Sequence, residues 1–167
     1  MGKERIAELI ETLDLSPHPE GGYFKETYRS EGWIKALPPE YSAARNYSTC
    51  IYFLLTSEMF SAFHRIHQDE AWHFYEGSSI ALHTISPDGQ HQEHHIGMDL
   101  KKGERPQLMV PGGHWFASKV IDPDSYALVG CTVAPGFDFA DFELAKRAAL
   151  SKQFPQHSEL IEAFSRT

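Results

Sequence analysis

The sequence has few cysteines, no long apolar run and no concentration of basic residues. Its two cysteines, Cys50 and Cys131, each lie within an apolar run. Two thiols of this kind indicate a reducing compartment rather than a disulfide-linked secreted protein, so we expect a cytoplasmic protein. The longest strictly apolar run, Cys50–Leu55, has six residues, far fewer than the roughly 20 needed to cross a bilayer.

The chain is acidic, and its charges are spread along its length. Lys and Arg together number 15 and Asp and Glu 23, which gives a formal charge of −8. Because the basic residues form no stripe, we expect neither nucleic acid nor a membrane as a partner. The length fits one domain, since domains most often have about 100–150 residues, and no repeat or linker divides the chain. We therefore expect a single domain over residues 1–167.

Apolar spacing predicts a short helix followed by a long series of strands. Ile6, Leu9, Ile10 and Leu13 recur at helical spacing, and Pro17 ends that segment. Nine short apolar or alternating segments follow, separated by turns rich in Gly, Pro and Asp: Tyr23–Arg29, Ser48–Thr56, Phe60–His67, Ala71–Glu76, Ile80–Ser86, Gln92–Met98, Gln107–Val110, Trp115–Ile121 and Tyr126–Val133. Strands at this spacing, with no helices between them, predict an all-β sandwich or barrel.

Helical spacing returns near the end of the chain. Phe142, Ala145, Ala148 and Ala149 predict an amphipathic helix, which Pro155 interrupts. A second helical piece follows, with one apolar face made of Leu160, Ile161 and Phe164. We therefore expect short helices on either side of the β region in the sequence.

The segment around His64 resembles the first motif of the cupin superfamily. In that motif two His one residue apart on a strand precede a Glu, and a Gly follows the Glu after six residues. His64, Glu70 and Gly77 match this spacing. Alternate residues of a strand share a face, so the resemblance implies that the imidazole points into the barrel and that the Glu enters from the next strand.

Two positions that usually supply metal ligands in cupins differ here. The second His position of the first motif is Ile66, and the His position of the second motif is Phe116. His67 and His114 lie close by, but their parity is opposite. A shift of one residue turns a side chain to the other face of a strand unless a bulge intervenes.

His64 and Glu70 remain as the metal-ligand candidates. Transition metals usually have at least three protein ligands, so a divalent metal is an alternative rather than a requirement, and the sequence calls for no other cofactor. A metal-dependent enzyme would use these two residues together with His67 or His114.

A closer resemblance covers almost the whole chain. It is similar to one small cupin family in the segments Pro17–Phe24, Glu26–Arg29, Ile51–Leu55, His64–Arg65, Asp69–Tyr75, Gln107, Val110–Pro111, Trp115–Phe116 and Thr132–Phe139. That family has no assigned reaction and is usually described as similar to the sugar-nucleotide epimerases that isomerise dehydrorhamnose. The resemblance implies a double-stranded β-helix, the jelly-roll barrel of cupins, and a homodimer. It implies no particular reaction, because one fold hosts many functions.

His64 and Glu70 are the candidate catalytic residues. In a pocket with aromatic walls, burial raises the pKa of a carboxyl group and a nearby His lowers it, so either residue could act as acid or base. Ten further residues are candidates for ligand binding: Arg65, Trp72, His73, Tyr75, Gln107, His114, Trp115, Phe116, Phe137 and Asp138.

Each candidate also has a purely structural interpretation. The His64–Glu70 pair could be a hydrogen bond that only satisfies two buried polar groups. Arg65 has the parity opposite to His64 and could form an outward ion pair with Glu26 or Asp69. His73 and Tyr75 likewise oppose Glu70 in parity, and the aromatic residues after the last strand could dock a helix rather than cap the pocket.

Three functions are compatible with these residues. The first is isomerase- or epimerase-like proton transfer on a small polar ligand, sugar-like or nucleotide-like, with His64 taking a proton next to a carbonyl. The second is a metal-dependent enzyme. The third is a binding module for a small molecule with no catalysis.

Overall fold

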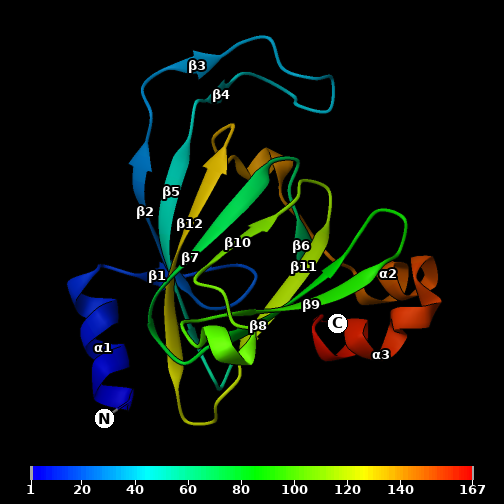
Figure 1. The fold of residues 1–167 in the computed structure, drawn as a ribbon. Coiled ribbons are helices and arrows are strands. Elements are labelled where there is room, and N and C mark those ends of the chain that lie inside the picture. The colour runs from blue at the N-terminus through cyan, green and yellow to red at the C-terminus, as the bar shows by residue number, and fades with distance from the viewer. Residues whose placement is uncertain (1, 167) are drawn as a thin grey trace.

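Two antiparallel β-sheets carry most of the strands in residues 2–166, the part of the chain that the computed structural model describes. The six-stranded sheet has the order β1 (Ser16–Pro17), β2 (Tyr23–Arg29), β5 (Thr49–Thr56), β12 (Tyr126–Ala134), β7 (Asp69–Gly77) and β10 (Gln107–Val110). The five-stranded sheet has the order β13 (Glu143–Leu144), β6 (Ser61–Arg65), β11 (Trp115–Val120), β8 (Ile80–Ile85) and β9 (His91–Ile96). Because β12 lies between β5 and β7, segments distant in the sequence are neighbours in space (Figure 1).

The interior of the barrel is filled by side chains at one end and contains a cavity at the other. On β5, Ile51, Phe53 and Leu55 share the inner face. Leu55 pairs in register with Ala127, and both are buried in the main apolar core. Ile51 pairs with Cys131, and both border a cavity. The candidate site therefore lies at the open end of the barrel.

Helix α1 (Gly2–Thr12) confirms the helix predicted near the start of the chain. It lies on the outer face of the six-stranded sheet, where Leu9 is buried beside Leu54 and Leu128. Arg5 fixes the helix to the sheet by donating hydrogen bonds of 2.7 and 2.8 Å to the two carboxylate oxygens of Glu76.

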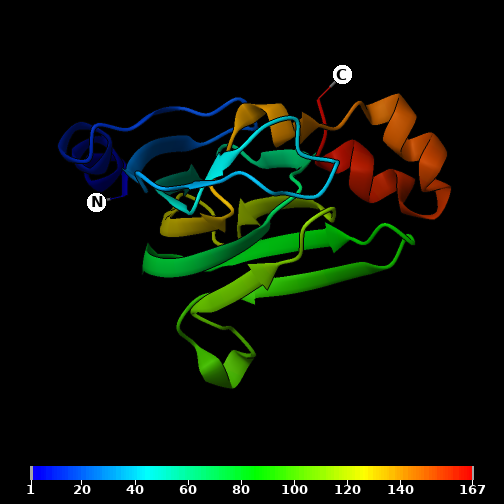
Figure 2. The same ribbon diagram turned by 90° about the horizontal axis from the view of Figure 1, so that it is seen from above.

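Helices α2 (Arg147–Gln153) and α3 (Ser158–Ala163) lie on the side of the molecule away from α1 (Figures 1 and 2). Their apolar residues Leu150 and Ile161 form a second core with Phe63, which points outward from β6. As predicted, a break at Pro155 separates the two helices, with η3 (Pro155–His157) between them. No helix within residues 2–166 has the length and apolar character needed to span a membrane.

The expected helical position of Phe142 is wrong. This residue follows η2 (Phe139–Asp141), precedes β13, and is extended, with φ of −89° and ψ of 130°. Its ring lines the cavity instead of covering the sheet from outside. The helix begins five residues later because β13 first pairs with β6.

All nine predicted strands are present, with ends within two residues of the prediction. The strands that the sequence pattern missed have two residues each, too few to show alternation. Two of them, β3 (Trp33–Ile34) and β4 (Arg45–Asn46), pair in a segment that extends beyond the barrel in Figure 1. A short 3₁₀ helix, η1 (Leu100–Lys102), lies between β9 and β10.

Candidate functional site

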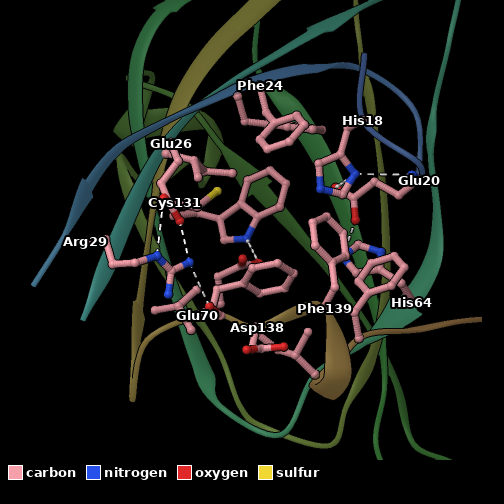
Figure 3. Close-up of a pocket in the computed structure, with 17 residues that line it drawn as sticks. His18, Glu20, Phe24, Glu26, Arg29, His64, Glu70, Cys131, Asp138 and Phe139 are labelled. Carbon is pink, nitrogen blue, oxygen red and sulfur yellow. Dashed lines mark hydrogen bonds and ion pairs between the residues drawn. The ribbon is translucent and has the colours of Figure 1, made fainter. Parts of the chain in front are cut away.

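A cavity of about 290 Å³ occupies the open end of the barrel. Its walls include six aromatic rings, those of Phe24, Phe53, Trp72, Phe137, Phe139 and Phe142. The ionisable residues that line it are His18, Glu20, Glu26, Arg29, His64, Glu70, Cys131 and Asp138. Figure 3 shows the Glu20–His64 side of this cavity opposite the Arg29 side. The site thus combines flat apolar walls with a few concentrated acid and base groups.

The turn between β1 and β2 brings Glu20 to the cavity. Gly21 and Gly22 have φ of 111° and 83°, as expected for a glycine turn. A Cβ on Gly21 would collide with the carbonyl oxygen of Phe60, so only glycine lets the turn approach the barrel this closely. Arg166 donates a hydrogen bond of 3.3 Å to the Glu20 carbonyl oxygen. The backbone of Glu20 is therefore held from two sides.

Glu20 and His64 form a buried ion pair. The Nε2 of His64 lies 2.6 Å from Oε2 of Glu20, and its Nδ1 lies 2.8 Å from the carbonyl oxygen of Ala62. A carbonyl oxygen can only accept, so Nδ1 carries a proton. The directions of the two pKa shifts favour a second proton on Nε2, which makes the ring an imidazolium facing a carboxylate. Burial alone would lower the pKa of His64 and raise that of Glu20, but their mutual attraction outweighs it: the pKa of His64 is raised and that of Glu20 lowered.

His18 faces the cavity as a neutral imidazole. Its Nδ1 accepts a hydrogen bond of 3.2 Å from the backbone N–H of Glu20. Burial lowers the pKa of His18, and the His64 imidazolium lowers it further despite the opposing effect of Glu20. The single ring proton therefore resides on Nε2, where it is available to a hydrogen-bond acceptor.

Glu70 is a cavity acid whose pKa is raised close to neutral pH. Burial and the nearby Glu20 carboxylate raise its pKa to about 7, although His64 and the indole N–H of Trp72 lower it. That indole donates a hydrogen bond of 2.8 Å to Oε2 of Glu70. Near neutral pH this carboxyl group is present in both protonation states, which is the condition that general acid–base catalysis favours.

The mouth of the cavity is charged and more exposed than its interior. The guanidinium of Arg29 pairs with Glu26 and donates hydrogen bonds to Asn46 Oδ1, at 2.9 Å, and to the carbonyl oxygen of Phe137, at 3.0 Å. Phe137 and Phe139 pack edge to face, with ring centroids 4.9 Å apart. The segment after β12 therefore caps the cavity, one of the two roles considered for its aromatic residues.

A buried polar network supports the capping segment from behind. Arg45 on β4 donates to both carboxylate oxygens of Asp141, at 2.8 and 2.7 Å. Gln68 donates to the same carboxylate, at 2.8 Å, and to the carbonyl oxygen of Gly136, at 3.1 Å. These contacts connect β4, the β6–β7 turn and η2, so they fix the position of the residues at the mouth.

The donor atoms in the cavity do not fit the divalent metal considered above. His64 has no free ring nitrogen, since Nδ1 contacts a backbone carbonyl and Nε2 contacts Glu20. A metal would have to break that ion pair to bind His64 and Glu70 together. His67 and His114 do not line the cavity. Among residues 2–166, no three His, Cys, Asp or Glu side chains are arranged to hold a metal ion, whereas a transition metal usually has at least three protein ligands.

The structure brings five of the predicted site residues to the cavity: His64, Glu70, Trp72, Phe137 and Asp138. His64 and Glu70 face the same space, as the resemblance to the cupin motif implied, but the partner of His64 is Glu20. Phe116 lies behind the imidazole, with ring centroids 4.0 Å apart, and supports it without lining the cavity.

Arg65 and Trp115 lie outside the cavity. Because Arg65 is next to His64 on β6, its side chain emerges on the opposite face. There its guanidinium stacks over Trp115 at 4.4 Å and pairs with Glu143 at 2.8 Å. The outward ion pair is therefore present, with Glu143 in place of the two partners considered from the sequence. Trp115 belongs to the core beneath α2 and α3.

The structure does not bring the remaining four candidates, His73, Tyr75, Gln107 and His114, to the cavity. His73 points to the outer face of the six-stranded sheet, where its Nε2 lies 3.1 Å from Thr132 Oγ1. Tyr75 and Gln107 are exposed on β7 and β10. His114 lies in the turn between β10 and β11, with Nδ1 buried.

Sequence reasoning missed His18, Glu20, Glu26 and Arg29 as site residues. His18 and Glu20 lie in a turn, where strand alternation does not predict which way a side chain points. The other two lie on β2, which is exposed along most of its length. The resemblance to the cupin family could have pointed to these four residues, because Pro17–Phe24 and Glu26–Arg29 are among the segments on which that resemblance rests.

Residues 7–145 match a family model described as Cupin superfamily (DUF985). The chain belongs to this cupin family. It is 34% identical over 152 residues to the uncharacterized protein YML079W of Saccharomyces cerevisiae, a match that covers 84% of this chain and 75% of the yeast protein. The crystal structure of protein SO0799 from Shewanella oneidensis is 42% identical, with a TM-score of 0.86 over 95% of this chain and 96% of that one.

Other solved structures confirm the fold. A hypothetical protein from Leishmania major is 35% identical, with a TM-score of 0.90 over 96% of this chain and 98% of that one. Oxalate decarboxylase from Bacillus subtilis is 14% identical, with a TM-score of 0.56 over 91% of this chain and 37% of the enzyme. At that identity the likeness concerns the fold alone. The chain is a jelly-roll cupin barrel, as the resemblance implied.

Proposed function

We propose that this cupin is an acid–base enzyme that isomerises a small polar carbonyl compound, with Glu70 as the group that moves the proton. The observation that carries the proposal is the position of Glu70: it lines the cavity beside the Glu20–His64 pair, and its pKa is about 7. A pKa near the working pH lets one carboxyl group serve as base in one step and as acid in the next.

The proposed step is a proton shift between neighbouring carbons. The Glu70 carboxylate takes a proton from the carbon next to the carbonyl, and the electrons of that C–H bond move to the carbonyl oxygen, which becomes an enolate. The Nε2–H of His18 is available to donate a hydrogen bond to that oxygen. When the deprotonated carbon carries a hydroxyl group, the hydroxyl proton moves to the enolate oxygen. Glu70 then returns its proton to the former carbonyl carbon, and the hydroxyl oxygen becomes the new carbonyl oxygen. With one base the proton leaves and returns on the same face, so we favour isomerisation over epimerisation.

His64 has a different role from the one expected of it. Because both of its ring nitrogens are engaged, it cannot take a proton from a ligand without breaking the ion pair. Its positive charge neutralises Glu20 and lowers the pKa of Glu70. We propose that His64 positions Glu20 and balances its charge, and that Glu70 is the residue that transfers the proton.

Deuterium exchange tests this proposal. We expect the protein to accelerate exchange at the CH₂ group of 2-hydroxyacetophenone, an uncharged α-hydroxy ketone, in D₂O. Glu70→Gln keeps an acceptor for the Trp72 indole but removes the acid, and we expect it to lose roughly 100-fold or more of the rate. Mass spectrometry of the recovered ketone measures the exchange.

The control is Glu143→Gln, which removes a carboxylate on the outer face and should keep the full rate. Exchange no faster than in buffer, or equal in the wild type and Glu70→Gln, would contradict the proposal. If the ketone binds saturably without exchange, the barrel is a non-catalytic binding module for small molecules.

The homodimer and the cytoplasmic location stay predictions. The outer face of the six-stranded sheet exposes Tyr75 and Met109, which are 54% and 55% accessible in the single chain. If a second copy binds, we expect it to cover this face, because large exposed apolar side chains of this kind mark interaction surfaces.

A further inference from the structure

The cations in the cavity are already matched by anions. Arg29 is engaged by Glu26, by Asn46 and by the carbonyl oxygen of Phe137. His64 is engaged by Glu20 at 2.6 Å. Neither cation is available to a ligand unless an existing ion pair breaks, which is costly for the buried pair.

The acidic groups are in excess. Asp138 at the mouth uses Oδ1 to accept a hydrogen bond of 2.8 Å from the backbone N–H of Ala140, and no ion pair to it is present among residues 2–166. Glu70 carries a negative charge in the fraction of molecules that are deprotonated. A carboxylate or phosphate on a ligand would therefore meet negative charge without a free cation to compensate it.

The size and walls of the cavity further restrict the ligand. A volume of about 290 Å³ equals the space of roughly ten liquid waters, enough for a molecule of about ten to fifteen non-hydrogen atoms. Flat rings such as those of Phe53 and Trp72 favour a flat, apolar ligand face. The donors are Nε2–H of His18 and the protonated carboxyl of Glu70, so the ligand has to supply an acceptor oxygen.

We propose that the ligand is an uncharged ring compound bearing a carbonyl oxygen, and that Glu70 excludes carboxylated and phosphorylated analogues. This inference rests on the proposed function only in placing the ligand beside Glu70. Of the sugar-like and nucleotide-like ligands considered from the sequence, this inference keeps only those that are uncharged and compact. A nucleoside diphosphate carries charges that the cavity has no free cation to neutralise.

The test compares benzamide with benzoate, which have the same shape and differ in charge. Binding is followed in the NMR signal of the Trp72 indole N–H, which reports on Glu70 through their hydrogen bond. At pH 8 we expect benzamide to bind at least tenfold more tightly than benzoate. Because the pKa of Glu70 is about 7, lowering the pH to 6 should strengthen benzoate binding roughly tenfold. Benzamide binding should change much less, because its amide can donate to the Glu70 carboxylate and accept from the protonated carboxyl.

The charged and titratable groups around Glu70 are Glu20, His64 and the Cys131 thiol. Glu70→Gln separates the titration of Glu70 from that of the Glu20–His64 pair, and Glu26→Gln tests the role of Arg29. Glu70→Gln should abolish the pH dependence of benzoate binding. Glu26→Gln frees Arg29 and should strengthen benzoate binding in both conditions.

Benzoate binding as tight as benzamide binding at pH 8 would overturn the inference. So would an unchanged pH dependence in Glu70→Gln, or no response of Trp72 to benzamide at millimolar concentration. The two proposals can fail independently. The protein could prefer benzamide over benzoate and yet not accelerate deuterium exchange, which would contradict only the proposed function.

Discussion

Asp141→Ala is expected to lower the free energy of unfolding by about 4 kcal/mol, since it removes one partner of a buried ion pair. The Arg45 and Asp141 side chains are 3% and 1% exposed and meet at 2.7 Å. An arginine cannot relieve its isolation by losing a proton, because its pKa exceeds 12. Without Asp141, Arg45 therefore stays charged and buried, and Gln68 also loses an acceptor. Equilibrium denaturation in urea measures the loss.

Glu143→Ala is the matched control. The Arg65–Glu143 pair is almost as short, at 2.8 Å, but its side chains are 38% and 57% exposed. Water solvates both charges when an exposed pair is broken, so we expect a loss below about 1 kcal/mol. Equal losses in the two variants would show that burial does not determine the strength of these pairs and would contradict this view of the capping segment.

Glu20→Ala is expected to lower the free energy of unfolding by about 3 kcal/mol at pH 6, a smaller loss than for Asp141→Ala because His64 can shed its proton. The folded pKa of Glu20 is below its ordinary value of 4.5, so its contribution is present above pH 4.5 and is lost as the pH falls through the folded pKa. The folded pKa of His64 is above 6.5, so its contribution is present below pH 6.5 and is lost as the pH rises through the folded pKa.

The stabilisation from this pair is therefore largest between about pH 4.5 and 6.5. Urea denaturation of both proteins across this range measures it, and Glu26→Ala at the exposed mouth should cost less than about 1 kcal/mol. In Glu20→Ala the pKa of His64, followed by NMR, should fall below 6.5, because only the Ala62 carbonyl and Glu70 then oppose the effect of burial. A pKa that stays raised would mean that another group holds the His64 proton.

The spacing of apolar residues in the sequence was enough to predict the longer strands of the barrel. Strands of four or more residues alternate, so β5, β6, β7 and β12 could be placed. The inward direction of His64 and Glu70 followed from the resemblance to the cupin motif. Strand alternation then put Arg65 and His73 on outer faces. Two-residue strands such as β3 carry too little pattern, and Phe142 followed helical spacing although it lies in an extended segment.

The partner of His64 could not be deduced in the same way. Glu70 was the expected partner because it follows on the next strand, whereas Glu20 arrives from a turn between β1 and β2. The direction of a turn residue depends on contacts far away in the sequence, here those of Gly21 with Phe60 and of Glu20 with Arg166. Only the resemblance to a family drew attention to that segment.

The pKa of Glu70 is the most direct test of the proposed chemistry. ¹³C NMR of protein labelled at the Glu carboxyl carbons, with Glu70→Gln to identify the signal, measures it during a pH titration. We predict a midpoint near 7. A midpoint near the ordinary value of 4.5 would mean that Glu70 is fully ionised at neutral pH, and neither the proton transfer nor the pH-dependent exclusion of anions assigned to it would then hold.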